Sequence, residues 1–227
     1  MQEFFFVLET VGVIAFAIAG SIAAIDKETD IFGVLFLSFM TCLGGGMIRD
    51  LLIDRTPSFF TSNFHILCAF ITSLTVFIFA SAFKRKYIEH GKIVEHINNY
   101  FDAIGLGIFS VTGAKICMDS GFDSALVAIS LGMITGVGGG MIRDLCLREI
   151  PFVFNKRIYA VASIIGAFVY FVLLKFSCFP EYFSFLIGVF SVVVIRILAT
   201  IFHLNMPKAI VYKNNEAKNI KKCKNYI

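Results

Sequence analysis

The sequence predicts an all-α polytopic membrane protein with seven transmembrane helices, arranged as an inverted 3+3 repeat plus a seventh helix. Three observations support this prediction. Hydrophobic residues make up 58% of the 227 residues and charged residues only 16%, whereas a typical soluble domain carries about 25% charged residues. The mean hydropathy is +0.83. The heptapeptide GGGMIRD occurs at Gly44–Asp50 and again, 94 residues later, at Gly138–Asp144.

Seven segments are long and apolar enough to span a bilayer, which requires about 20 residues of helix. No basic residue precedes Lys27, so the first segment lacks the basic region of a signal peptide and is expected to remain as a transmembrane helix. The connections are short apart from Lys84–Asn99, and the tail from His203 onward is polar and rich in lysine. The predicted spans are Phe4–Ile25, Ile31–Ile53, Asn63–Phe83, Tyr100–Met118, Ser124–Leu147, Ile158–Phe176 and Tyr182–Phe202.

The positions of the basic residues predict the orientation of the chain. With seven spans, fourteen Lys and Arg residues fall in the connections and tail on one side, and only Arg55 and Lys175 on the other. Cytoplasmic segments carry such an excess. The N-terminus is therefore expected outside and the C-terminus in the cytoplasm. The same distribution accounts for the net charge of +4, so we expect membrane lipids, and no nucleic acid, as partners.

The repeat extends beyond the heptapeptide and divides the chain. Thr41 matches Thr135, and Pro57 matches Pro151. The two copies lie in the second and fifth spans, so each repeat unit holds three spans, and the second unit enters the membrane in the opposite direction. Inverted repeats commonly place a binding site or pore where the halves meet. The predicted divisions are residues 1–92 and 93–177 for the two repeats, 178–204 for the seventh helix and 205–227 for a basic cytoplasmic tail.

The triple glycines admit two interpretations. A glycine in a helix costs about 1 kcal/mol relative to alanine, so three together are expected to kink or unwind the second and fifth spans. The freed backbone groups would then line a hydrated path or coordinate a cation, with the hydroxyls of Thr41 and Thr135 beside them. The alternative is close packing of small residues. A nucleotide-binding loop is disfavoured, because GxxxxGK[ST] is absent and no βαβ unit surrounds the glycines.

Each triple glycine is followed by an Arg-Asp pair, Arg49-Asp50 and Arg143-Asp144. One interpretation is that the arginines extend to the membrane surface, with the aspartates as local partners. The other is that buried ion pairs bracket the two mouths of a path. Since adjacent residues do not face each other on a helix, each charged residue is expected to find its partner on another span.

Three further charged residues lie within or at the ends of apolar spans. Lys115 either faces the path, as a charge gate, a voltage-sensitive element or a contact for a substrate carboxylate, or extends outward to the membrane surface. Arg196 is expected to extend to the cytoplasmic surface, and Asp102 to favour the N-terminal dipole of the fourth span. The candidate path residues are Gly44, Gly45, Gly46, Gly138, Gly139, Gly140, Thr41, Thr135 and Lys115, with Arg49, Asp50, Arg143 and Asp144 as charged pairs near the path.

The sequence predicts no metal site, no cofactor and no enzymatic activity. Its six Cys and four His residues show no CxxC pair and no HExxH spacing. Cysteines inside apolar runs are expected to pack as small apolar residues. No pattern resembles a catalytic nucleophile with its base.

Together, these motifs resemble those of the bacterial relatives of the trimeric intracellular cation channels, a group that also carries a glycine transporter domain label. The resemblance lies in GGGxxRD in spans two and five, AFAIAGS at Ala15–Ser21 and DAIGLG at Asp102–Gly107. It covers about residues 4–202 and leaves the tail out.

The resemblance implies a homotrimer in the bacterial inner membrane. Each protomer would hold its own pore, selective for K⁺ and Na⁺, along the kinked second and fifth spans. Lys115 matches the region where family members carry a basic gating residue. Arginines beside a cation path also require Asp50 and Asp144 to neutralise them. Two alternatives remain: a secondary transporter of glycine or another small amino acid, and a scaffold whose glycines only pack.

Overall fold

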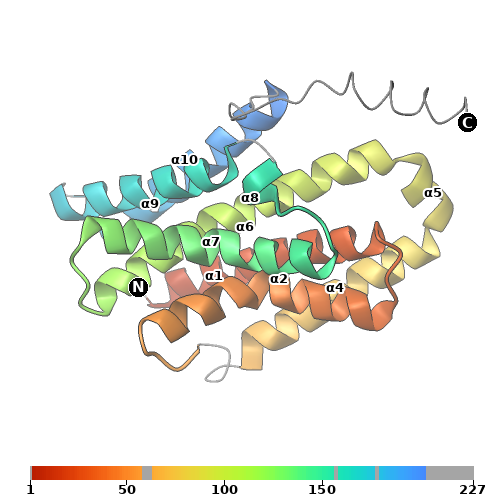
Figure 1. Cartoon of the computed structure of the whole chain (residues 1–227), viewed down its shortest axis with the longest axis horizontal. Coiled ribbons are helices and arrows are strands. Elements are labelled where there is room, and N and C mark those ends of the chain that lie inside the picture. The colour runs from red at the N-terminus through yellow and green to blue at the C-terminus, as the bar shows by residue number, and fades with distance from the viewer. Residues whose placement is uncertain (1, 58–62, 156–157, 177–178, 203–227) are drawn as a thin grey trace, which may run out of the picture.

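The computed structural model describes residues 2–57, 63–155, 158–176 and 179–202, and every regular element within these ranges is a helix. Seven of the helices are long and apolar enough to cross a membrane, which confirms the predicted fold class (Figure 1). The predicted tail of residues 205–227 lies outside the described residues. The helices are α1 (Gln2–Ile25), α2 (Ile31–Leu52), α4 (Asn63–Ala82), α5 (Lys84–Glu89), α6 (Gly91–Asp119), α7 (Ala125–Cys146), α8 (Phe152–Asn155), α9 (Tyr159–Phe176) and α10 (Glu181–Ile201).

Helix α6 departs most from the predicted boundaries. It begins at Gly91, whereas the fourth span was expected to begin at Tyr100. The added turns are polar, because hydropathy marks where a helix enters the bilayer and not where its backbone hydrogen bonds start. Asp102 consequently lies inside a 29-residue helix and not at its first turn. The prediction that Asp102 favours a helix N-terminus is therefore wrong.

Four helices form the centre of the bundle. Helices α1, α2, α6 and α7 pack against one another, with α1 against α6 and α2 against α7. Helix α4 covers α1 and α2, while α9 covers α6 and α7. Helix α10 packs on α9 and α6, on the side of the bundle away from α4 (Figure 1). The first three spans and the next three thus have matching neighbours, and α10 is the addition.

The backbone repeats where the sequence repeats. Beyond α2, Asp54 has a φ of 54°, and beyond α7 the corresponding residue, Arg148, has a φ of 57°. In each copy the heptapeptide aspartate accepts a backbone hydrogen bond from the residue five positions later, at 2.8 Å from Arg55 and at 2.9 Å from Glu149. The duplicated sequence therefore folds into a duplicated helix end, one copy at each end of the bundle.

Helices α2 and α7 run through their glycines without interruption, so the predicted unwinding of Gly44–Gly46 and Gly138–Gly140 is wrong. The glycines instead let the two helices cross at very short distance. A Cβ atom on Gly45 would lie 2.0 Å from the carbonyl oxygen of Thr135, and one on Gly139 would lie 1.9 Å from the carbonyl oxygen of Thr41. Close packing of this kind keeps every helical hydrogen bond. We call this contact the glycine crossing.

The two threonines support the glycine crossing from their own helices. The hydroxyl of Thr41 donates to the carbonyl of Leu37, and that of Thr135 to the carbonyl of Leu131, each at 2.6 Å. Both threonines are buried. Their hydroxyls are thus used within α2 and α7, and they satisfy carbonyls of intact helices instead of carbonyls freed by unwinding.

Helices α1 and α6 form a second symmetric contact beside the glycine crossing. The rings of Phe16 and Phe109 stack with their centroids 5.3 Å apart. Each ring lies over a glycine of the other helix, since a Cβ on Gly105 would be 2.2 Å from Phe16 and one on Gly12 would be 3.1 Å from Phe109. The four central helices therefore meet through two pairs of glycine contacts.

Adding one methyl group at the glycine crossing should destabilise the protein. We expect Gly45→Ala to lower the free energy of unfolding by about 1–3 kcal/mol or more, the usual cost of overpacking, because its Cβ would overlap the Thr135 carbonyl. Gly46→Ala is the matched control, since the nearest atom to its Cβ would be 3.7 Å away. Thermal unfolding in detergent compares the two variants. Equal midpoints for both would contradict the close crossing.

Candidate functional site

The third glycine of each triple glycine differs from the two before it in the atoms that a side chain at that position would meet. Among the described residues, a Cβ on Gly46 would meet only the Arg49 guanidinium, 3.7 Å from its Nη2. A Cβ on Gly140 would lie 3.7 Å from Nη2 of Arg143 and 3.2 Å from the hydroxyl of Tyr159. Each triple glycine therefore supplies packing positions for the crossing and then one position that faces the arginine of its own Arg-Asp pair.

The Arg-Asp pairs are buried, and each is formed by adjacent residues. Nε and Nη2 of Arg49 both lie 2.8 Å from Oδ1 of Asp50, and Nε of Arg143 lies 2.9 Å from Oδ1 of Asp144. The arginines are 4% and 0% exposed, so the interpretation in which they extend to the membrane surface is wrong. The expectation of a partner on another span holds only in part. Among the described residues, Arg143 adds such an ion pair, 3.5 Å from Asp102 of α6.

The reach of the arginine side chain explains this outcome. Adjacent Cβ atoms point to different sides of a helix, but the guanidinium stands at the end of a long, flexible stem. It can curl back to a carboxylate one residue away and present several N–H groups to it. Burial favours this arrangement, since an unpaired charge away from water is costly.

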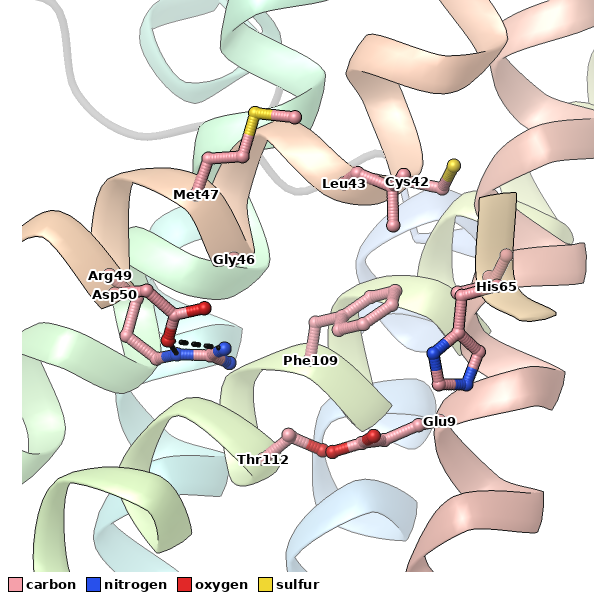
Figure 2. A pocket seen from close by; sticks show the side chains of 11 residues that line it. Glu9, Cys42, Leu43, Gly46, Met47, Arg49, Asp50, His65, Phe109 and Thr112 are labelled. Atoms are coloured by element: carbon pink, nitrogen blue, oxygen red, sulfur yellow. Dashed lines mark hydrogen bonds and ion pairs between the residues drawn. The ribbon is translucent and has the colours of Figure 1, made fainter. Parts of the chain in front are cut away.

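A first cluster of charged and polar side chains borders a cavity at the end of the bundle where α1 begins. We call it the Glu9 cluster: Glu9 of α1, Arg49 and Asp50 of α2, and His65 of α4 (Figure 2). The cavity has a volume of about 50 Å³ and is also lined by Gly46. Nε2 of His65 lies 3.4 Å from the hydroxyl of Thr10. Carboxylates, an arginine and the third glycine of α2 thus meet at one small opening.

A larger cavity lies beside this one. It measures about 480 Å³ and shares Glu9, His65 and Thr112 with the smaller cavity. Lys115 lines it and is bound by two carboxylates, with its Nζ 2.7 Å from both Asp119 and Glu181. The side chain of Lys115 is 16% exposed. Lys115 therefore lies at the wall of the cavity with its charge compensated.

The second charged group lies on the far side of the glycine crossing. We call it the Asp102 cluster; its members are Asp102, Arg143, Asp144, Tyr159 and Arg196. Asp102 accepts a hydrogen bond from Tyr159 at 3.3 Å and lies 3.2 Å from Nη2 of Arg196. The guanidinium of Arg196 stands 4.6 Å above the ring of Tyr159. All five residues are buried, so the prediction that Arg196 extends to the cytoplasmic surface is wrong.

A third cavity approaches the Asp102 cluster from the opposite end of the bundle. It measures about 500 Å³ and is lined by charged residues and by Phe152. The backbone N–H of Phe152 donates to Asp144 at 2.9 Å, and its ring lies 5.0 Å from the Arg143 guanidinium. Phe152 therefore lies between this cavity and the cluster. The charged lining residues are Asp26, Lys27, Glu95 and Glu149.

Connecting segments at this end are fixed by polar contacts. Lys27, between α1 and α2, pairs with Glu149, beyond α7. The hydrogen bond to Glu149 raises the pKa of Lys27. Burial raises the pKa of Asp26, while the hydrogen bond donated by Tyr87 opposes that rise. The two repeats are thus tied together outside the apolar core.

Sequence reasoning missed Glu9, His65 and Tyr159, and gave Asp102 and Arg196 the wrong roles. The signal was present: the pattern acid-x-x-Gly-x-x-x-Phe-x-x-x-Gly begins at Glu9 and again at Asp102. Glu9 and Asp102 are therefore corresponding carboxylates on α1 and α6. They differ in environment, since Glu9 borders a cavity and Asp102 is 1% exposed among its partners.

The chain is similar to known membrane proteins in sequence and in structure over most of its length. The family model described as Glycine transporter matches residues 6–81 and 99–175. The inner membrane protein YadS of Escherichia coli is 33% identical over 201 residues, which is 88% of this chain and 93% of that protein. A structure solved to explain conductance through TRIC cation channels is 35% identical, with a TM-score of 0.79 over 91% of this chain and 98% of that one. The trimeric intracellular cation channel orthologue from Rhodobacter sphaeroides is 29% identical, with a TM-score of 0.78 over 88% and 98%.

The two corresponding carboxylates should respond differently to neutralisation. We expect Asp102→Asn to lower the free energy of unfolding by about 3–5 kcal/mol, because it leaves buried arginines without their shared partner. Glu9→Gln should cost less than about 1 kcal/mol, since Glu9 borders a cavity. Chemical or thermal unfolding in detergent measures both. A larger loss for Glu9→Gln than for Asp102→Asn would contradict the assigned environments.

Proposed function

We propose that this chain, which belongs to the glycine transporter family of membrane proteins and resembles the bacterial trimeric intracellular cation channels, is a passive channel for monovalent cations. The path runs beside the glycine crossing within one protomer, and K⁺ and Na⁺ are the permeant ions. Three such protomers form a homotrimer in the bacterial inner membrane. The N-terminus faces outward, so the Glu9 cluster lies at the outer end of the path and the Asp102 cluster at the inner end.

The observation that carries this proposal is the pair of neighbouring cavities at the outer end, the smaller of which is lined by Gly46. Their walls hold three carboxylates, with Asp119 in the larger cavity, Glu9 shared by both and Asp50 in the smaller one, alongside the basic residues Arg55, Lys115 and Arg49. Carboxylate groups lining a pore favour cations. Asp50 also neutralises Arg49, which would otherwise repel a cation from the narrowest part.

The likeness to solved channels supports the same function. The two TRIC structures named above are similar to this chain over almost their entire lengths. A channel does not have to close around a substrate. The glycine crossing, in which backbone packs rigidly against glycine, therefore suits a channel. In this proposal α2 and α7 are a fixed frame, and the third glycines, Gly46 and Gly140, give the path its width. Residues 1–92 and 93–177 form the two halves that enclose it.

A carrier for glycine or another small amino acid is the second candidate. One observation favours it: the small cavity brings Glu9 and Arg49 together, so both charges of a zwitterion have a complementary partner. A carrier would show saturable uptake without unitary currents.

Recordings in a planar bilayer under a KCl gradient separate the two candidates. We expect unitary currents that reverse near the K⁺ potential with no organic substrate present. Gly46→Leu should reduce the current at least tenfold, because the side chain fills the cavity of about 50 Å³. Gly91→Leu is the control, since nothing lies within 4 Å of a Cβ there. A silent bilayer with folded protein, together with saturable glycine uptake, would replace the channel by the carrier.

Glu9 should contribute to charge selectivity. Glu9→Gln removes a carboxylate shared by both outer cavities, so we expect a lower K⁺ to Cl⁻ permeability ratio. The reversal potential in a KCl gradient should shift towards zero, while Glu28→Gln, at an exposed connection, should leave it unchanged. An unaltered reversal potential in Glu9→Gln would place the selective part of the path elsewhere.

A further inference from the structure

The two ends of the path are built from corresponding residues but carry different charge. Glu9, Arg49 and Asp50 at the outer end correspond to Asp102, Arg143 and Asp144 at the inner end. With both carboxylates ionised, each set has two negative charges and one positive charge. Helix α10 adds a charged residue at each end: Arg196 beside Asp102 at the inner end, and Glu181 beside Lys115 at the outer end. Because α10 follows the two repeats, the outer end has no counterpart of this arginine from a seventh helix.

Arg196 changes the inner end in two ways. Its positive charge cancels the remaining negative charge of the Asp102 cluster. Its guanidinium also holds Asp102 at 3.2 Å, while Tyr159 binds the other oxygen of the same carboxylate. Asp102 is thereby kept against Arg143.

The Arg196 guanidinium does not use all of its donors within the part of the chain that the structure describes. There, Nε of Arg196 is buried without a hydrogen-bond partner. A cavity of about 180 Å³ borders Arg196 on the side of the α6 N-terminal turns, with His96, Asn99 and Thr200 in its wall. The guanidinium therefore has a space with polar partners to enter when it leaves Asp102.

We infer that Arg196 is a positioning residue that holds the inner end of the path closed, and that the path opens inward when Arg196 leaves Asp102. The seventh helix is then the gating element of an otherwise symmetric frame. This inference rests on the proposed function in treating the Asp102 cluster as one end of the path.

Hydrogen–deuterium exchange of the full chain in liposomes tests whether Arg196 holds the inner end closed. The measurement does not require that the protein conducts ions. We expect Arg196→Gln to raise amide exchange at least tenfold in residues 102–106 and 139–145, and to leave residues 9–13 and 46–50 unchanged. Arg196→Lys should stay closer to the wild type than Arg196→Gln, because it keeps the charge beside Asp102 although it loses the stacking of the guanidinium on Tyr159. If Arg196→Gln does not fold, the double variant D102N/R196Q removes both charges together and should show the same local increase.

Other outcomes overturn the inference. Unchanged exchange at the inner end would show that Arg196 holds nothing closed. A uniform increase in amide exchange at both ends would assign Arg196 a general structural role. Equal exchange in Arg196→Lys and Arg196→Gln would show that the charge of Arg196 is not what holds the inner end closed. Potassium flux from the same liposomes separates the two proposals. Raised local exchange together with raised flux supports both the closure by Arg196 and the cation channel. Raised local exchange without flux supports the closure by Arg196 and rejects the channel.

Discussion

The architecture depends on one contact, the crossing of α2 and α7 in which a carbonyl from each helix lies against a glycine of the other. The Thr41 carbonyl faces Gly139 and the Thr135 carbonyl faces Gly45, with no room for a side chain at either glycine. In a membrane, where burial of apolar surface gives helices little reason to associate, such backbone proximity is a main source of attraction. Since the contact joins equivalent positions of two repeats, it also fixes how the halves face each other.

That crossing determines where the charges lie. In each heptapeptide the Arg-Asp pair follows the glycines by about one turn of helix, so the two pairs are carried to opposite sides of the contact. Asp50 and Asp144 compensate their neighbouring arginines, which makes burial of the guanidinium groups tolerable. The remaining carboxylates, Glu9 and Asp102, come from α1 and α6. The frame is thus symmetric, and its two ends differ mainly through what packs around these carboxylates.

The sequence was sufficient to predict the seven spans, the inverted repeat and the importance of the two heptapeptides, because hydropathy and duplication are properties of the chain itself. Of the two interpretations of the glycines, the expected unwinding is wrong and the alternative of close packing is confirmed. The low helix propensity of glycine argues for unwinding. The contact between α2 and α7 instead stabilises intact helices at Gly45 and Gly139, and this contact cannot be inferred from helix propensity. The expectation of partners on other spans holds for Arg143, which reaches Asp102, but each guanidinium also pairs with its adjacent aspartate because Cβ directions do not limit a long side chain. The correspondence of Glu9 with Asp102 was readable, but only when the spacing of Gly12, Phe16 and Gly20 is compared with that of the second repeat.

The central claim is that a cation passes between Glu9 and the glycine crossing. Anomalous diffraction from crystals grown with Rb⁺ in place of K⁺ tests it most directly, since Rb⁺ is located independently of how well the channel conducts. We expect an anomalous peak in the cavity bounded by Glu9, Gly46 and Thr112, and loss of that peak in Glu9→Gln crystals. A Rb⁺ peak elsewhere along the protomer, with this cavity empty, would contradict the proposed path.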